Sequence, residues 1–279
     1  MLKITRADGT AEKQVLETMR SRSMEVDRKV TASVAQIVEE VRTGGDRALR
    51  DCTLRFDGQC PDCFEVEREQ IIGSLASADP DFVSSLLKAM ENISTFHRHQ
   101  VQQSFVDTQT SGVIMGQRIR GLERVGLYVP GGTASYPSSV LMNCIPAKIA
   151  GVGEVVMVTP PRKDGTANPD ILTAAAVAGV DRVFLLGGAQ AVAALAYGTE
   201  TIPRVDKIVG PGNIYVATAK KLLYGTVDID MVAGPSEILI AADETANPVW
   251  LAADMMSQAE HDELASSILL TTSERIAQE

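Results

Sequence analysis

The chain has 279 residues, of which 45% are hydrophobic and 22% are charged, and its formal net charge is −10. This composition is typical of a globular protein with a sizeable core and excludes a largely disordered chain. The acidic balance argues against binding of nucleic acid or of an anionic membrane surface, because both need clustered Lys and Arg.

The first third of the sequence is predicted to be helical. Apolar residues recur at helical spacing at Val30, Val34, Ile37, Val38 and Val41. The Gly44-Gly45 pair should end that helix, and Asp46 is expected to cap a second one. A third helix is predicted from about residue 79 to 96, with an apolar stripe made by Phe82, Leu86, Leu87, Met90 and Ile93.

From Gly126 onward, short apolar runs alternate with glycine and proline. Buried strands are predicted at 124–127, 151–158, 179–186 and 205–209, and Ala-rich helices at 169–178 and 189–197. Strands joined by helices at this spacing form βαβ units, so the strands should be parallel. The pattern predicts half of a doubly wound nucleotide-binding sheet.

The last part of the chain repeats this pattern once. Strands are expected at 238–243 and 266–272, and Asn247-Pro248 should start the helix between them. This helix is expected to run to about Glu263 and to bury Leu251, Ala252, Met255 and Ala259. The final helix would have only about six residues, and the strand before it needs a covering element. We therefore expect that the chain is cut short at its C-terminal end.

Glycine-rich turns follow three of the predicted strands, at residues 128–133, 187–190 and 210–213. Glycines between a strand and a helix let backbone N–H groups approach a phosphate. Each turn taken alone could equally be a turn without a ligand. Since the carboxyl ends of parallel strands share one edge of the sheet, the three turns together predict a nucleotide site. The amides of Gln190 and Asn213 could orient a ribose or an amide group.

Gln258 and His261 lie three residues apart, on one face of a predicted helix. This spacing suits a metal site, but a lone histidine more often makes an ordinary hydrogen bond, and zinc needs about four ligands. The spacing by itself leaves both interpretations open. Cys60 and Cys63 form a Cys-x-x-Cys pair without a second pair, so incidental loop cysteines are favoured over a zinc or redox site.

Several segments together closely resemble the histidinol dehydrogenase family. They are Gly45–Leu49, Arg55–Gly58, Gly126–Gly132, Gly187–Ala191, Gly210–Asn213, Ala233–Glu237 and Ser257–His261. The resemblance covers essentially the whole chain. It implies an α/β fold with a helical N-terminal region and two incomplete Rossmann-like parallel-sheet domains, similar to aldehyde dehydrogenases. It also implies an N-terminal arm at 1–22, a first domain at 23–127 plus 235–279, and an NAD-binding domain at 128–234.

The resemblance implies an oxidoreductase of histidine biosynthesis that oxidises L-histidinol to L-histidine through L-histidinaldehyde, with NAD and Zn²⁺. Tyr128, Gln190 and Asn213 are expected to contact NAD. Ser236, Gln258 and His261 are expected to bind the substrate, and Gln258 and His261 also the zinc. A cytoplasmic homodimer is implied for the full-length protein, with no nucleic-acid or membrane partner.

One departure from the family pattern concerns catalysis. The family's adjacent Glu-His pair and its remaining Asp and His zinc ligands would lie beyond residue 279, so no catalytic residue is assigned here. The chain alone is therefore expected to be truncated relative to the family and inactive. The alternative hypothesis is a non-catalytic nucleotide-binding module, which would have no need of Ser236, Gln258 and His261.

Overall fold

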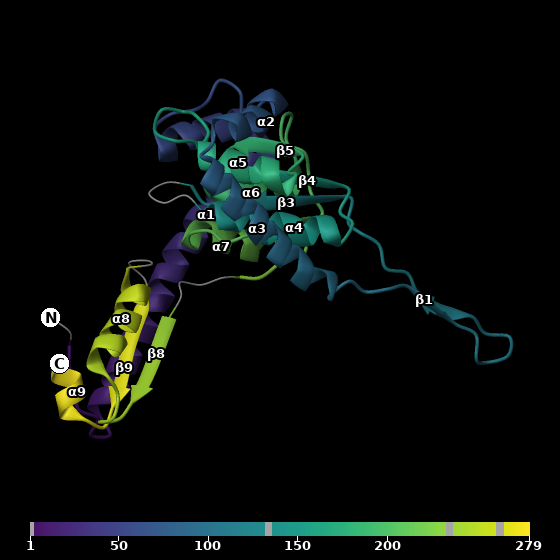
Figure 1. Ribbon diagram of the computed structural model, residues 1–279. Coiled ribbons are helices and arrows are strands. Elements are labelled where there is room, and N and C mark those ends of the chain that lie inside the picture. Colours follow the sequence, from purple (N-terminus) through teal and green to yellow (C-terminus); the bar gives the residue numbers. More distant parts are fainter. Residues whose placement is uncertain (1–2, 132–135, 233–236, 261–264) are drawn as a thin grey trace. The chain divides into compact units, whose positions relative to one another are not determined.

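The computed structural model describes residues 3–131, 136–232, 237–260 and 265–279, with the backbone alone described at 20–27. The chain divides into a larger unit, Thr31–Val232, and a smaller unit, Met1–Val30 with Ala233–Glu279. Helix α1 (Ala11–Asp57) contributes residues to both units (Figure 1).

The larger unit is built on a five-stranded parallel sheet in the order β5-β4-β3-β6-β7. Its strands are β3 (Arg124–Tyr128), β4 (Glu154–Thr159), β5 (Arg182–Leu185), β6 (Lys207–Val209) and β7 (Asp228–Ile229). The chain adds β4 and β5 on one side of β3, then crosses to add β6 and β7 on the other side. The strand order therefore reverses beside β3, which is where open α/β sheets bind ligands.

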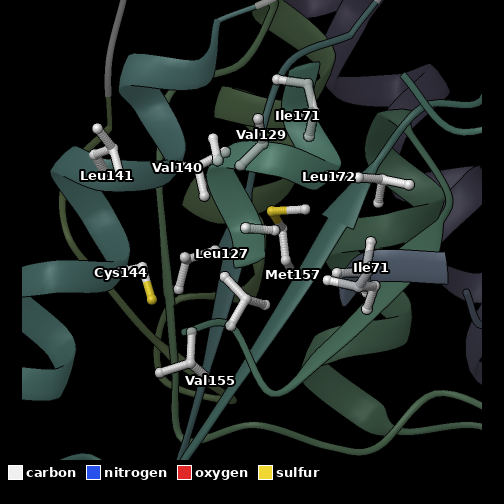
Figure 2. Packing of buried hydrophobic residues seen from close by; sticks show 14 of the residues in the cluster. Ile71, Leu127, Val129, Val140, Leu141, Cys144, Val155, Met157, Ile171 and Leu172 are labelled. Carbon is white, nitrogen blue, oxygen red and sulfur yellow. The ribbon is translucent and has the colours of Figure 1, made fainter. Parts of the chain in front are cut away.

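Helices cover both faces of this sheet. They are α2 (Arg68–Ser77), α3 (Pro80–Arg98), α4 (Pro137–Ile149), α5 (Pro169–Ala178), α6 (Gly188–Tyr197) and α7 (Ile214–Leu223). On one face, alternate residues such as Leu127 and Met157 pack with side chains of α2 to α5 (Figure 2). On the other face, a Cβ added to Gly126 would lie 2.9 Å from the Leu195 side chain of α6. The result is a doubly wound layer structure.

Local sequence signals set the ends of several of these helices. The Asn168 side chain accepts N–H bonds from Asp170 and Ile171 at 2.9 and 3.4 Å, and so caps α5. Gly179 ends the same helix with a φ of +76°, a conformation that favours glycine. Asp79 accepts the N–H of Asp81 at 3.0 Å at the start of α3.

The smaller unit contains a parallel strand pair, β8 (Glu237–Ala242) and β9 (Ser266–Thr271), joined by α8 (Pro248–Ala259) and followed by α9 (Glu274–Gln278). The Ser267 hydroxyl donates to the Met255 carbonyl at 3.0 Å, and Ser267 lies opposite Ile238 in the strand pair. The end of α8 therefore lies over the first residues of both strands.

Two further strands, β1 (Phe105–Asp107) and β2 (Met115–Gln117), form an antiparallel hairpin in the larger unit. Several apolar side chains of this hairpin are exposed, including Phe105, Val106 and Met115. Neither this hairpin nor helix α2 was predicted from the sequence. Among the described residues, no helix combines the length and the apolar character needed to cross a membrane.

The predicted α/β fold with parallel strands is confirmed, and α5 occupies the predicted residues. Gly45, with a φ of +54°, interrupts α1 where a helix end was predicted. The predicted cap at Asp46 is wrong, because its carboxylate instead accepts the hydroxyls of Thr199 and Thr201.

Two further predictions about burial are wrong. Leu87 does not join the buried stripe of α3 but is exposed. Helix α8 has no buried residue, although Leu251, Ala252, Met255 and Ala259 were expected to be buried. Both errors arise because an apolar side chain is buried only where another element covers it.

Candidate functional site

A cavity of about 780 Å³ lies in the larger unit, where the strands of the sheet end. This volume falls in the range of small-molecule and cofactor sites. The turns that follow strands β3 to β6 supply part of its lining: Tyr128, Pro130, Gly131, Pro160, Pro161, Gly188, Ala189, Gln190 and Asn213. The predicted convergence of the three glycine-rich turns is therefore present in the structure.

Tyr128, the last residue of β3, is buried and links two of these turns. Its hydroxyl oxygen accepts the backbone N–H of Gly188 at 3.0 Å. Burial raises the pKa of Tyr128 to about 12, although the Gly188 N–H partly opposes this by stabilising the phenolate. Tyr128 is thus a neutral phenol near pH 7, and its O–H proton remains available for donation to a ligand.

Gln190 lies in the first turn of α6 and is only 1% exposed. Its carboxamide makes no hydrogen bond with any described residue, yet it lines the cavity. A Cβ added to Gly188 would lie 2.5 Å from the Gln190 Oε1 atom, so the glycine makes room for the amide. A buried amide without a protein partner is a ready donor and acceptor for a polar ligand.

Asn213 caps helix α7 and also lines the cavity. Its Oδ1 accepts the backbone N–H groups of Tyr215 and Val216 at 3.0 and 3.2 Å. Its Nδ2 makes no hydrogen bond within the described part of the chain. The cap therefore fixes the side chain and leaves an amide donor for a ligand.

The charge around the cavity is mixed, with basic groups at the turn after β4. Arg162 and Lys163 line the cavity, are exposed, and form no ion pair with a described residue. The first residues of α6 and α7 also line it, so two helix N-termini contribute positive potential. Asp57 lies in the same wall, where desolvation raises its pKa. Phosphate groups are the ligand chemistry that fits these features.

The structure also places residues in the cavity wall that the sequence analysis did not assign to a site. They include Ser33, Gln36 and Ile37 of α1, together with Arg162, Lys163 and Tyr215. The position of Arg162 and Lys163 directly after a predicted buried strand was an available signal. No local pattern marks the α1 residues, because they reach the cavity only through the tertiary fold.

The residues predicted to bind substrate and metal belong to the smaller unit. Gln258 is half-buried in the last turn of α8, whereas Ser236 and His261 lie outside the described residues. Within the described ranges, no group of three or more His, Cys, Asp or Glu side chains is placed to hold a metal ion. Gln258 alone offers one amide oxygen, which does not make a zinc site. All four cysteines are free thiols, including the Cys60 and Cys63 pair.

Comparisons with known proteins identify the family of the chain. Residues 20–279 match the family model of histidinol dehydrogenase. The chain is 53% identical over 270 residues to the histidinol dehydrogenase of Clostridium acetobutylicum and 54% identical over 271 residues to that of Listeria innocua. These alignments cover 96% and 97% of this chain and 63% of each relative.

A solved structure of the same family also matches the chain. The crystal structure of histidinol dehydrogenase from Elizabethkingia anophelis superposes with a TM-score of 0.78 at 40% identity, over 88% of this chain and 57% of that one. The chain thus spans less than two thirds of the length of the proteins it matches. The match nevertheless covers nearly all of its own residues, and the chain belongs to the histidinol dehydrogenase family.

Proposed function

We propose that the protein serves in histidine biosynthesis as an oxidoreductase that converts L-histidinol to L-histidine through L-histidinaldehyde, with NAD⁺ as the oxidant. The observation that carries this proposal is the cavity at the ends of the parallel strands, where Tyr128, Gln190 and Asn213 meet. The family membership supplies the reaction, and the cavity supplies a place for the dinucleotide. A cytoplasmic location and a homodimer are part of the same proposal.

The residues around the cavity fit a dinucleotide. The N-terminal turns of α6 and α7, together with Arg162 and Lys163, would bind the pyrophosphate. The buried Gln190 amide would bind ribose hydroxyls or the carboxamide of the nicotinamide, and so would the Asn213 Nδ2, which makes no hydrogen bond with a described residue. The cap hydrogen bonds hold the Asn213 side chain in place before any ligand arrives, which lowers the entropic cost of binding.

The described residues limit the roles available in the reaction. When bound, NAD⁺ would supply the oxidant by accepting a hydride from the substrate carbon in each of the two oxidations. The first oxidation would release one proton, and the second would consume a water molecule and release two protons, because its product is a carboxylate. Tyr128, with a pKa of about 12, cannot accept these protons near neutral pH and acts as a hydrogen-bond donor. We assign no general base among the described residues.

The substrate and metal residues are proposed from the family resemblance. Ser236, Gln258 and His261 would bind L-histidinol, and Gln258 and His261 would hold Zn²⁺, which would act as a Lewis acid and anchor. Gln258 is the described member of this set, and it does not form a metal site by itself. No step of the reaction is therefore assigned to the metal.

Calorimetric titration with NAD⁺ tests the proposal. The wild-type chain should bind NAD⁺, and Asn213→Asp should weaken binding about tenfold, because the carboxylate keeps the α7 cap but removes the amide donor. Asn168→Asp is the matched control, since Asn168 caps α5 in the same way but does not line the cavity. Its NAD⁺ affinity should equal that of the wild type.

Three outcomes decide between the candidate functions. Absence of NAD⁺ binding, or an equal loss in both Asn variants, would overturn the nucleotide site. NAD⁺ binding that L-histidinol alters, and that responds to Gln258→Ala, would support the oxidoreductase. NAD⁺ binding indifferent to L-histidinol would instead favour a nucleotide-binding module.

A further inference from the structure

An ion pair between the buried Lys220 and the partly exposed Asp230 lies directly behind the third glycine-rich turn, Gly210–Asn213. Lys220 of α7 is buried, and its side chain is 3% exposed. Its ammonium group donates to the Asp230 carboxylate and, at 3.0 Å, to the carbonyl of Gly210. The other Asp230 oxygen, Oδ2, accepts the N–H of Gly210 at 2.8 Å. The pair therefore satisfies both backbone groups of a single residue in the turn.

Gly210 has little freedom to move within this arrangement. Its φ is +112°, and a Cβ added there would lie 2.2 Å from the carbonyl oxygen of Tyr128. The turn is thus pressed against the end of β3 on one side and bonded to Lys220 and Asp230 on the other. The Asp230 backbone is itself fixed, since its N–H donates to the Ile208 carbonyl of the sheet at 3.2 Å.

This arrangement sets the position of Asn213. Only Pro211 and Gly212 separate Gly210 from Asn213, which caps the helix that also carries Lys220. Lys220 lies seven residues after Asn213, about two helical turns along α7, and reaches back to the turn. The turn and the helix start are therefore closed into one hydrogen-bonded loop.

A buried lysine is an unexpected choice for stability alone. Burying an ammonium group is strongly unfavourable before pairing, and apolar residues of similar size often stabilise a core as well or better. Lys220 stands in an α7 segment whose buried neighbours are otherwise Val216, Ala217, Thr218, Ala219 and Leu223. An ammonium group donates several hydrogen bonds and can hold a carbonyl and a carboxylate together, which an apolar residue cannot do.

We propose that Lys220 and Asp230 are positioning residues for the cofactor: they hold the Gly210–Asn213 turn in the conformation that presents the Asn213 amide to the dinucleotide. This inference rests on the proposed function, because it assumes that the cavity binds NAD⁺. Neither residue needs to touch the cofactor, and their effect passes through Gly210.

The test compares two lysine substitutions of the same kind. Lys220→Met should weaken NAD⁺ binding about tenfold, because the turn loses the donor to Gly210 and its fixed geometry. Lys148→Met is the matched control. Lys148 pairs with Asp181 at 2.6 Å, and that carboxylate also accepts a backbone N–H, from Val155, but none of these residues lines the cavity. The control should bind NAD⁺ as tightly as the wild type.

A double-mutant cycle separates positioning from a general loss of stability. In the Asn213→Asp background, Lys220→Met should weaken NAD⁺ binding less than about twofold, since the group that it positions is already lost. Equal effects in both backgrounds would overturn the inference. The combined variant Lys220→Met/Asp230→Asn avoids leaving the Asp230 carboxylate without its cation, and the cycle is repeated with it if Lys220→Met alone does not fold.

Hydrogen exchange keeps the inference separate from the proposed function. The backbone amides of Gly210 and of residues 212–214 should exchange faster in Lys220→Met than in Lys148→Met, with or without NAD⁺. If the wild type binds no NAD⁺, the proposed function fails. Faster exchange at the Gly210–Asn213 turn in Lys220→Met would then still show that Lys220 and Asp230 hold this turn. If the wild type binds NAD⁺ and Lys220→Met binds it equally well, the positioning role is wrong while the proposed function stands.

Discussion

Strands β4 and β8 have similar sequences but different surroundings. Five consecutive residues of β4, Val155–Thr159, are buried, whereas the residues of β8 alternate between exposed and half-buried. The helices that follow them differ in the same way: α5 has five buried residues and α8 has none. Apolar character alone therefore does not determine burial. Parallel strands become a core where helices cover both faces, as they do in the larger unit.

This difference separates the residues proposed to bind the cofactor from those proposed to bind the substrate. The proposed cofactor residues stand on elements that are held by a dense core and by buried hydrogen bonds, such as that between Tyr128 and Gly188. Gln258 stands on a helix with little buried surface. We infer that the geometry of the cofactor site is fixed by the fold of the larger unit, which the following predictions test.

The largest expected effect is on the core of the larger unit. Leu127 of β3 is fully buried, so Leu127→Ala should lower the free energy of unfolding by about 2–5 kcal/mol. Leu239 of β8 is 66% exposed, so Leu239→Ala should change the free energy of unfolding by less than about 0.5 kcal/mol. Urea unfolding followed by circular dichroism measures both. Similar losses at the two positions would contradict the contrast between the units.

A second, smaller effect is expected at a buried polar contact. Tyr128→Phe removes the acceptor of the Gly188 N–H and should cost about 1–3 kcal/mol, because a buried donor is left without a partner. Tyr224→Phe is the control, since Tyr224 is 67% exposed, and it should leave the unfolding free energy unchanged within error. A Tyr128→Phe variant as stable as the wild type would show that Gly188 finds another acceptor.

The sequence predicted those parts of the fold that local signals encode. Helix α5 was placed correctly from its Ala-rich run, and the structure shows that an Asn cap starts it and a glycine ends it. The glycine-rich turns at the cavity were predicted because glycines separate a strand from a helix. The proposed roles of Lys220 and Asp230 were not predicted from the sequence. They depend on the contacts of Lys220 with Gly210, ten residues before it, and with Asp230, ten residues after it. The burial of α8 was wrong because the sequence does not show what covers a helix.

The smallest effect concerns two aspartates whose pKa values shift in opposite directions. Desolvation raises the pKa of Asp57 in the cavity wall of the larger unit above its ordinary value of 3.8. The unfolded chain then loses its proton at lower pH than the folded chain, so ionisation of Asp57 favours unfolding. Asp57→Asn should therefore stabilise the protein slightly near neutral pH. The gain should shrink as the pH falls through the raised pKa and vanish below 3.8, where both states are protonated.

Asp243 of the smaller unit provides the control with the opposite sign. Hydrogen bonds from the Thr245 hydroxyl and N–H, at 2.6 and 2.9 Å, lower the pKa of Asp243. Its ionised form favours folding, and that contribution is present above pH 3.8 and lost as the pH falls through the lowered pKa. Asp243→Asn should thus slightly destabilise the protein near neutral pH. Urea unfolding at about pH 4 and about pH 7 measures both variants. If both variants shift the free energy of unfolding in the same direction, desolvation in the cavity wall does not control the pKa of Asp57.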